Sequence, residues 1–374
     1  MIDDAINDAE RIVIKIGSAL LTDEDLGTVR QDWLDSVARD LTEFIKQDKE
    51  VVIVSSGAIA LGRKGVGISS KNRPSSIPLK LKQAAAALGQ VKLSRAYADS
   101  FTTHNIETAL VLLTPKDTEE RRAHLNARAT LLTLLRNNIV PIINENDTVS
   151  TTEIKFGDND RLAARVAQMI EADLVIQLST TDGLYTGDPT QNPSAEHVPL
   201  VEAISDDLFK MAGDAPAGLS TGGMKSKLEA ARIATQAGVH MIIASGKAPS
   251  PLSNIARATL FKASNKPITA RKKWISSHVK VEGTITIDAG AIEALRSGKS
   301  LLPAGAVSIE GAFNHGDPVE ITDNQGNKLA LGLVNYSAQE ARLILGLKSA
   351  DIPDALGFTR GNVLVHRDNL VLKL

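Results

Sequence analysis

The chain has 374 residues, 43% of them hydrophobic, which is enough for two domains with a sizeable core. Its net charge of -2 gives no overall attraction to nucleic acid or to an anionic membrane. The absence of cysteine excludes disulfides, thiolate catalysis and zinc sites built on sulfur. The acidic start MIDDAINDAER lacks the apolar region of a signal peptide, and no apolar run reaches the roughly 18 residues of a membrane helix. We therefore expect a cytoplasmic protein.

Short apolar runs rich in Val and Ile recur through the first 245 residues. They are RIVIKIG (11–17), VVIVSSG (51–57), ALVLLT (109–114), NIVPIIN (138–144), DLVIQLS (173–179) and VHMIIASG (239–246). Such runs predict strands buried on both faces of a parallel sheet. Helical patterns lie between them, as at 31–47 and 161–172, so we expect a doubly wound, mainly parallel α/β sandwich. Ligands of such sheets bind at the carboxyl ends of the strands.

The pattern changes after residue 246. Residues 247–259 (KAPSPLSNIARAT) resemble a loop, and 266–278 carry the basic run Arg271, Lys272 and Lys273. From about 279 the chain shows short strands and turns, which predict a small, mostly β barrel. We expect one domain over 1–262, a linker over 263–278 and a second domain over 279–374.

The first two predicted strands end in candidate anion-binding residues. Lys15 interrupts a buried strand beside Gly17, which is costly unless its ammonium meets a charge. The alternative is an edge lysine that reaches water. After the second strand, Ser56 and Gly57 allow a ligand close to the backbone, and Gly57 opens a predicted helix whose free N–H groups favour an anion. The alternative is an ordinary strand-to-helix turn.

Polar residues also follow the fourth strand, in NENDTV (144–149). Asn144 and Asp147 could hold an α-ammonium and hydroxyl groups, or could simply form a turn. In the next motif, FGDND, Asp158 and Asp160 flank Asn159. These carboxylates could cap a helix, fix lysine side chains or bind a hydrated Mg²⁺.

A glycine-rich segment, GLSTGGMKSKLEAA (218–231), resembles a phosphate-binding loop but lacks the P-loop pattern, because Met224 stands where the lysine should be. At 100° per residue, Lys225 points to water and Lys227 points into the protein. The preceding STGG offers N–H groups at a helix start, which favours phosphate over the alternative of a surface lysine on a mobile loop. The loop 179–193, with Tyr185, could cover a nucleotide base and ribose or be a surface loop.

Taken together, these motifs resemble the amino-acid kinase family, and within it the branch that phosphorylates glutamate. The resemblance rests on VIKIGS (13–18), VIVSSGAIALG (52–62), LNARATLLTLLRNNIVPIINENDTV (125–149), FGDNDRLAA (156–164), DGLYTGDPTQNP (182–193) and GLSTGGMKSKLEAA (218–231). The tail, with RKKWI (271–275), SLLPAGAVSIEGAFNHGDPVEI (300–321) and VHRDN (365–369), resembles the PUA module that many members append.

The resemblance implies a role for each matching residue. Lys15 and Lys227 would neutralise the phosphoryl group in flight, with Asp160 organising both lysines. Glutamate would bind at Ser56, Gly57, Asn144, Asp147 and Asn159. The nucleotide would contact Lys15, Ser179, Thr180, Asp182, Thr221, Gly222, Gly223, Met224, Lys225, Ser226 and Lys227. The sequence departs from the family at Thr180, where an aspartate is frequent.

The implied reaction is ATP-dependent phosphorylation of the side-chain carboxylate of L-glutamate to L-glutamyl 5-phosphate, the first step of proline biosynthesis. ATP and Mg²⁺ are the implied cofactors, with Mg²⁺ held mainly by the phosphates and Asp158 as a possible ligand. The resemblance further implies inhibition by proline, a homo-oligomer (dimer or tetramer) and glutamate-5-semialdehyde dehydrogenase as functional partner.

Three alternatives stay open from the residues. A relative with another acceptor, such as aspartate, acetylglutamate, carbamate or UMP, would keep the fold and the chemistry. An RNA-binding protein would use the PUA-like tail, although that tail is nearly neutral. An inactive regulator would have little use for two inward lysines.

Overall fold

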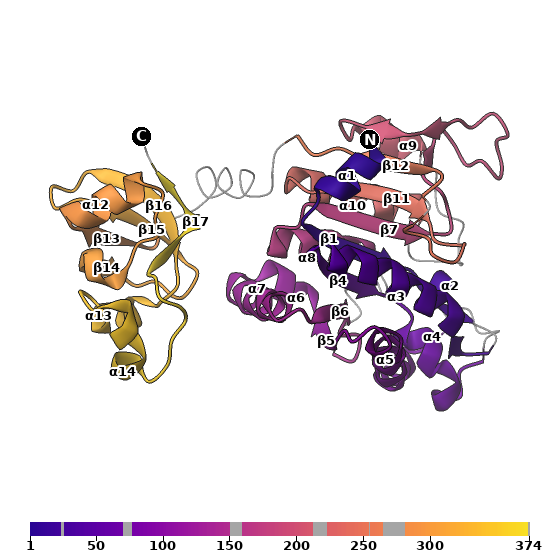
Figure 1. Ribbon diagram of the computed structural model, residues 1–374, viewed down its shortest axis with the longest axis horizontal. Coiled ribbons are helices and arrows are strands. Elements are labelled where there is room, and N and C mark those ends of the chain that lie inside the picture. Colours follow the sequence, from indigo (N-terminus) through magenta and orange to yellow (C-terminus); the bar gives the residue numbers. More distant parts are fainter. Residues whose placement is uncertain are drawn as a thin grey trace. The chain divides into compact units, whose positions relative to one another are not determined.

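The computed structural model describes residues 1–23, 26–69, 77–149, 159–211, 223–253, 255–264 and 281–372. The chain divides into two compact units, Met1–Pro267 and Ile268–Leu374 (Figure 1). The expected boundaries at 262 and 279 stay predictions, because residues 265–280 lie outside the described part. Within the described residues, no helix has the length and apolar character needed to cross a membrane.

The first unit is built on an eight-stranded sheet in the order β10-β12-β11-β7-β1-β4-β6-β5. Neighbouring strands are parallel, except that β11 and β12 are antiparallel. The strands are β1 (Arg11–Ile16), β4 (Glu50–Ser55), β5 (Thr108–Leu113), β6 (Val140–Glu145), β7 (Leu174–Ser179), β10 (Leu200–Val201), β11 (His240–Ser245) and β12 (Ala258–Phe261). All six predicted strands are therefore confirmed, and the stretch 247–259, expected to be a loop, runs into β12.

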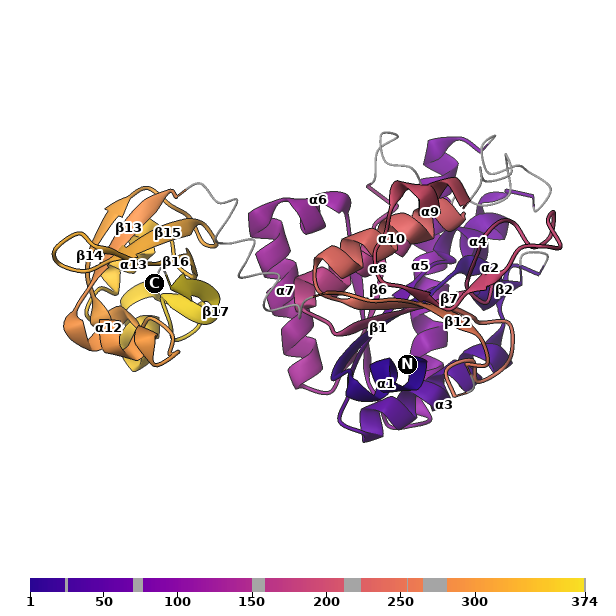
Figure 2. The ribbon, with the colours of Figure 1, turned by 90° about the horizontal axis from the view of Figure 1, so that it is seen from above.

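Helices cover both faces of this sheet, as Figure 2 shows for α8 and α10 on one face and α3 on the other. The longer helices are α3 (Gln31–Lys46), α5 (Leu79–Thr102), α7 (Arg121–Arg136), α8 (Asn159–Ile170) and α10 (Met224–Gln236). Shorter elements are α1 (Ile2–Asp8), α2 (Ser18–Leu21), β2 (Thr22–Asp23), β3 (Thr28–Val29), α4 (Ala58–Gly62), α6 (Pro115–Glu119), β8 (Leu184–Tyr185), β9 (His197–Val198) and α9 (Asp206–Met211). The unit is thus the expected doubly wound sandwich.

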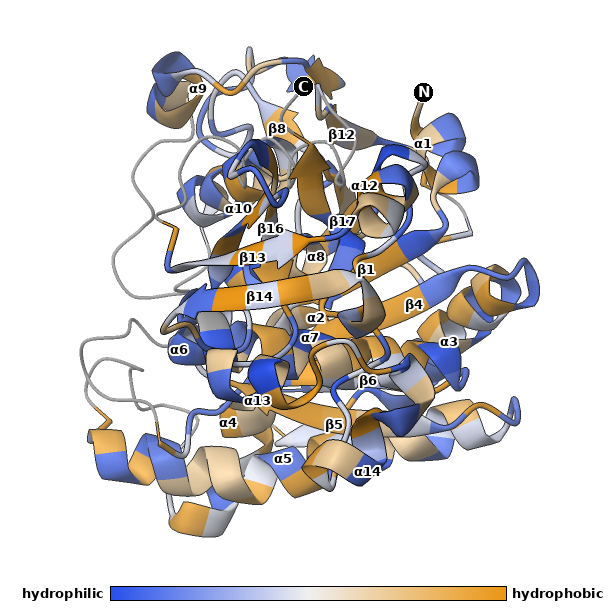
Figure 3. Cartoon of the chain, turned by 90° about the vertical axis from the view of Figure 1, so that its left-hand side faces the viewer, coloured by the Kyte–Doolittle hydropathy of each residue, from blue (hydrophilic) through white to orange (hydrophobic). Residues whose placement is uncertain are grey.

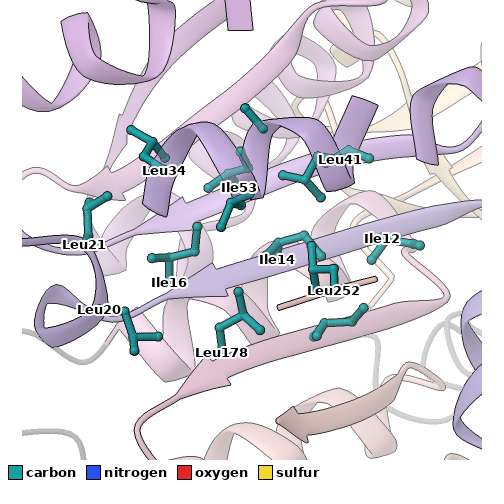
Figure 4. Packing of buried hydrophobic residues seen from close by; sticks show 14 of the residues in the cluster. Ile12, Ile14, Ile16, Leu20, Leu21, Leu34, Leu41, Ile53, Leu178 and Leu252 are labelled. Atoms are coloured by element: carbon teal, nitrogen blue, oxygen red, sulfur yellow. The ribbon is translucent and has the colours of Figure 1, made fainter. Parts of the chain in front are cut away.

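Strand β1 lies inside the sheet and is buried on both faces. Because side chains alternate along a strand, Ile12, Ile14 and Ile16 face the α3 layer, where they pack near Leu34 and Leu41 (Figure 4). Val13 belongs to the opposite core, among residues of α8 and α10. Lys15 shares that second face, so its ammonium is directed toward the two helices that begin at the carboxyl ends of the strands.

The second unit has a five-stranded mixed sheet in the order β14-β13-β15-β16-β17. Its elements are β13 (Gly283–Ile287), α12 (Ala289–Arg296), β14 (Ala306–Gly311), β15 (Pro318–Thr322), β16 (Lys328–Val334), α13 (Ala338–Leu343), α14 (Ile352–Leu356) and β17 (Val365–Leu372). Asp288 caps α12 by accepting a hydrogen bond from the Ala291 N–H at 2.7 Å. Figure 3 shows hydrophobic segments along β4 of the first unit and along β14 of the second unit. The expected mostly β module is confirmed.

Helix α5 crosses α4 at unusually close range because glycines stand at the contact. A Cβ added at Gly89 would lie 1.6 Å from the Ala58 carbonyl oxygen, and one added at Gly62 would lie 1.8 Å from the Ala85 carbonyl oxygen. Only glycine permits such an approach between two backbones. The crossing places α5 beside the start of α4, directly after Ser56 and Gly57.

We predict that Gly89→Ala destabilises the first unit by about 1–3 kcal/mol, although the same change at an exposed helix position stabilises by about 1 kcal/mol. The reason is the collision between the new Cβ and the Ala58 backbone. Denaturant unfolding checks the sign. Gly290→Ala is the matched control, because a Cβ there would meet nothing closer than the Asp288 carboxylate at 3.4 Å. Equal or greater stability of Gly89→Ala would contradict the close crossing.

Candidate active site

Two buried lysines from different elements meet one carboxylate. Lys15 from β1 and Lys227 from the first turn of α10 are each 7% exposed, and Asp160 in the first turn of α8 is 2% exposed. One carboxylate oxygen of Asp160 pairs with the Lys15 ammonium, and the other lies 3.1 Å from Lys227 Nζ. The Ser226 hydroxyl donates to the same oxygen as Lys227, at 3.3 Å. The predicted inward direction of Lys227 is confirmed, while Lys225 is exposed.

The charges of this trio do not cancel, because two ammonium groups share one carboxylate. Burial alone would raise the pKa of Asp160, but Lys15 and Lys227 outweigh it and hold that pKa well below its usual value. Asp160 therefore stays ionised at neutral pH. The two ammonium groups are buried close together, and an anion that binds beside them would be stabilised by both. The N-termini of α8 and α10 add further positive potential at this point.

A second polar cluster surrounds Asn159, the residue before Asp160. The Asn159 side-chain amide donates to the Ser56 hydroxyl at 2.8 Å, to the Asn144 side-chain oxygen at 3.0 Å and to the Ser55 carbonyl at 3.1 Å. The Asn144 oxygen also accepts from the Glu145 N–H at 2.8 Å. These bonds join the ends of β4 and β6 to the start of α8. Neighbouring residues of α8 thus belong to two adjacent polar clusters, Asn159 to one and Asp160 to the other.

Asp147 lies just beyond the end of β6 and is 7% exposed. Burial, with a smaller contribution from the charge of Glu145, raises its pKa to about 7. In the described part of the chain, its Oδ1 atom and the Oδ1 atom of Asn159 have no hydrogen-bond partner. Both atoms are acceptors, so this subsite lacks a donor, and a bound ammonium would supply one.

Only some of the predicted nucleotide-binding residues lie in the described part of the chain. Ser179 ends β7 and is buried, Thr180 is exposed, and Gly223 directly precedes α10. Asp182 accepts a hydrogen bond from the Tyr185 hydroxyl at 2.9 Å and lies 3.7 Å from Arg257. Thr221 and Gly222 lie outside the described residues, as does Asp158. Among the residues that are described, no group of three or more acidic or histidine side chains could hold a metal ion.

Sequence reasoning missed two buried amides near these clusters. Gln177 on β7 stands beside Lys15 in register, and no described residue hydrogen-bonds its side chain. Gln90 on α5 reaches the end of β6. Gln177 could have been noticed as the one polar residue within the run LVIQL, whereas Gln90 gives no comparable signal because it follows a long alanine-rich segment.

Comparison with known proteins agrees with this geometry. Residues 10–245 match the amino acid kinase family, and residues 283–356 match the PUA domain. Glutamate 5-kinase from Brucella anthropi is 51% identical over 366 residues, which cover 97% of this chain and 96% of that protein. Glutamate 5-kinase from Brucella ovis is 50% identical over 371 residues, which cover 98% of this chain and 97% of that protein.

Among solved structures, UMP kinase from Bacillus anthracis aligns at a TM-score of 0.49 and 17% identity, covering 68% of this chain and 97% of that one. The family match spans well over half of the chain, and the full-length relatives share half of its residues. The chain therefore belongs to the amino acid kinase family and carries a PUA domain at its C-terminal end.

Proposed function

We propose that the protein transfers the γ-phosphoryl group of ATP to the side-chain carboxylate of L-glutamate, giving L-glutamyl 5-phosphate and ADP. The observation that carries the proposal is the buried trio of Lys15, Asp160 and Lys227, which brings two ammonium groups together beside two helix N-termini. Full-length relatives named glutamate 5-kinase support the same activity.

The chemistry requires no general base. A carboxylate with a pKa near 4.3 is already ionised at pH 7 and can attack directly. Its oxygen forms a bond to the γ-phosphorus while the bond to the oxygen that bridges the β- and γ-phosphates breaks, and the electron pair leaves with ADP. Catalysis then depends on alignment and on neutralising the charge of the phosphoryl group, which Lys15 and Lys227 would do. Asp160 would hold both ammonium groups in place.

The acceptor would bind in the cluster around Asn159. Ser56, Gly57 and Asn144 would form its polar wall, and Asp147 would pair with the α-ammonium. The nucleotide would lie at the start of α10, over Gly223, Met224 and Ser226, and near Ser179. Mg²⁺ bound to the ATP phosphates would neutralise part of their charge. Thr221, Gly222 and Asp158 stay predicted contacts.

The resemblance to the family also supports a metabolic partner, an inhibitor and an oligomeric state for the protein. An acyl phosphate is labile, so glutamate-5-semialdehyde dehydrogenase would consume the product in proline biosynthesis. Proline would inhibit the enzyme, which would work in the cytoplasm as a homo-oligomer.

The direct test is ATP-dependent acyl-phosphate formation, trapped with hydroxylamine, on L-glutamate, L-aspartate and N-acetyl-L-glutamate in parallel. We expect product from L-glutamate only, because N-acetylation removes the ammonium and aspartate places its carboxylate one methylene short. Product from another acid would keep the phosphoryl chemistry and overturn the acceptor. Absence of product from all three would overturn the proposed function.

Lys227→Ala should lower kcat by about 100-fold or more, as removal of one preorganised charge donor does in other active sites. The glutamate KM should change little, because Lys227 would contact the phosphoryl group and not the cluster around Asn159 that binds glutamate. Steady-state kinetics on purified variants measures both constants. Lys46→Ala is the control, since Lys46 is exposed and pairs with Glu43 on α3. An unchanged kcat in Lys227→Ala would remove Lys227 from the mechanism.

The raised pKa of Asp147 predicts a pH-dependent glutamate KM. Below pH 7 the carboxyl becomes protonated and cannot pair with the α-ammonium, so the glutamate KM should rise by up to about tenfold for each unit by which the pH falls. Above pH 8 the glutamate KM should be constant. Asp147→Asn should have a high and pH-independent glutamate KM, with the ATP KM nearly unchanged. A normal glutamate KM in this variant would contradict the role.

The raised pKa of Asp147 also predicts that a rise in pH, which favours glutamate binding, lowers the stability of the fold. Between about pH 4 and pH 7 folded Asp147 binds more protons than unfolded Asp147, so its contribution to stability falls as the pH rises through this range. Asp147→Asn should therefore raise the melting temperature at pH 8 and leave it nearly unchanged at pH 4. A lower melting temperature of the variant at pH 8 would contradict this assignment of the pKa.

A further inference from the structure

The acceptor cluster has a neighbour on α5 that the mechanism above does not use. Gln90 follows Gly89, whose Cα lies against the Ala58 backbone at the close crossing of α4 and α5. This contact brings Gln90 beside the first residue of α4, directly after Ser56 and Gly57. From there its side chain reaches the end of β6, where the Nε2 atom donates to the Glu145 carbonyl at 3.3 Å. Gln90 thus connects α5 to the chain segment that leads from β6 to Asp147.

The remaining polar atom of Gln90 has no partner within the described residues. The side chain is buried, with the residue 5% exposed, and Oε1 makes no hydrogen bond there. A buried acceptor without a partner destabilises the fold, so native proteins seldom keep one without a function. The assignment of the two amide atoms is not arbitrary. Exchanging them would place Oε1 against the Glu145 carbonyl oxygen, and two acceptors would then face each other.

Three buried atoms in this region share the same deficiency. Gln90 Oε1, Asp147 Oδ1 and Asn159 Oδ1 are all acceptors, and none has a hydrogen-bond donor among the described residues. Asn159 cannot be reversed without placing its oxygen against those of Ser55 and Asn144. An ammonium has three donors and no acceptor, so it is the group best suited to acceptors of this kind. A hydroxyl or a neutral amide nitrogen would supply fewer donors.

We propose that Gln90 is a further substrate-binding residue of the acceptor site, where its Oε1 atom accepts a hydrogen bond from the α-ammonium of the amino acid. Its Nε2 atom at the same time holds the Glu145 carbonyl and so positions the segment that leads to Asp147. The inference rests on the proposed function and adds to it: α5 recognises the amino group, while β1, α8 and α10 act on the phosphoryl group.

The test compares Gln90→Met, which keeps the length of the side chain and removes both polar atoms, with Gln90→Glu, which keeps an oxygen acceptor. For Gln90→Met we expect a glutamate KM about 10–100-fold higher, since hydrogen bonds to charged groups contribute about 1.5–3 kcal/mol. The ATP KM and kcat should stay within about threefold. Gln90→Glu should give an intermediate glutamate KM, because the contact with the ammonium survives although the bond to Glu145 is lost.

Two controls separate recognition from a structural effect. Gln168→Met makes the same chemical change at an exposed position of α8 and should leave all constants unchanged. Glutarate, which is glutamate without the ammonium, serves as a competitive inhibitor, and its Ki should be nearly equal in the wild-type protein and in Gln90→Met. Thermal unfolding of each variant shows that it is folded under the assay conditions.

The outcomes distinguish this inference from the proposed function. If the wild-type protein phosphorylates glutamate but Gln90→Met has a normal glutamate KM, Gln90 takes no part in recognition. Equal losses of glutamate and glutarate binding, or a Gln90→Glu variant as weak as Gln90→Met, would show that Gln90 only supports the fold. A wild-type protein without activity on glutamate overturns both the proposed function and the role of Gln90.

Discussion

The arrangement of the site depends on the ion pairs that Asp160 makes with Lys15 and Lys227. All three residues are buried, and one carboxylate pairs with both ammonium groups. Removing the carboxylate would leave two like charges together in a poorly solvated place, which is far more costly than loss of an exposed ion pair. An anion that binds beside these two ammonium groups is stabilised by both of them, and a transferring phosphoryl group is the anion that the proposed reaction brings.

The fold meets this constraint by using one helix start for two purposes. Asn159 and Asp160 are consecutive, yet one binds the ends of β4 and β6 while the other binds the two lysines. A shift of α8 would therefore move the cluster around Asn159 and the two buried ammonium groups together. The close crossing at Gly89 likewise fixes α5 against the start of α4, directly after Ser56 and Gly57. Rigid packing around a polar site favours alignment, on which a reaction without a general base depends.

The sequence alone predicted the six main strands, the α/β sandwich and the inward direction of Lys227, because each of these follows from local periodicity. It also marked Lys15, since a charge within a run of isoleucine and valine is conspicuous. The order of the strands and the antiparallel β12 were beyond local patterns, because they depend on pairing between distant segments. Gln90 was missed for the same reason: only the contact of α5 with the end of β6 makes its environment unusual.

Partnerless polar atoms give the site a cost that an apolar core would avoid. Among the described residues, Gln90 and Asp147 each bury an acceptor that has no donor, and Gln177 buries a whole amide without a partner beside Lys15. Natural sequences place such local conflicts at functional sites and offset them elsewhere, here by the apolar packing of β1 and its neighbours on both faces of the sheet. The free protein is thus less stable than its fold would allow, and ligands that satisfy these atoms stabilise it by binding. In the proposed function, the same few residues therefore favour recognition of the amino acid and disfavour stability of the unliganded site.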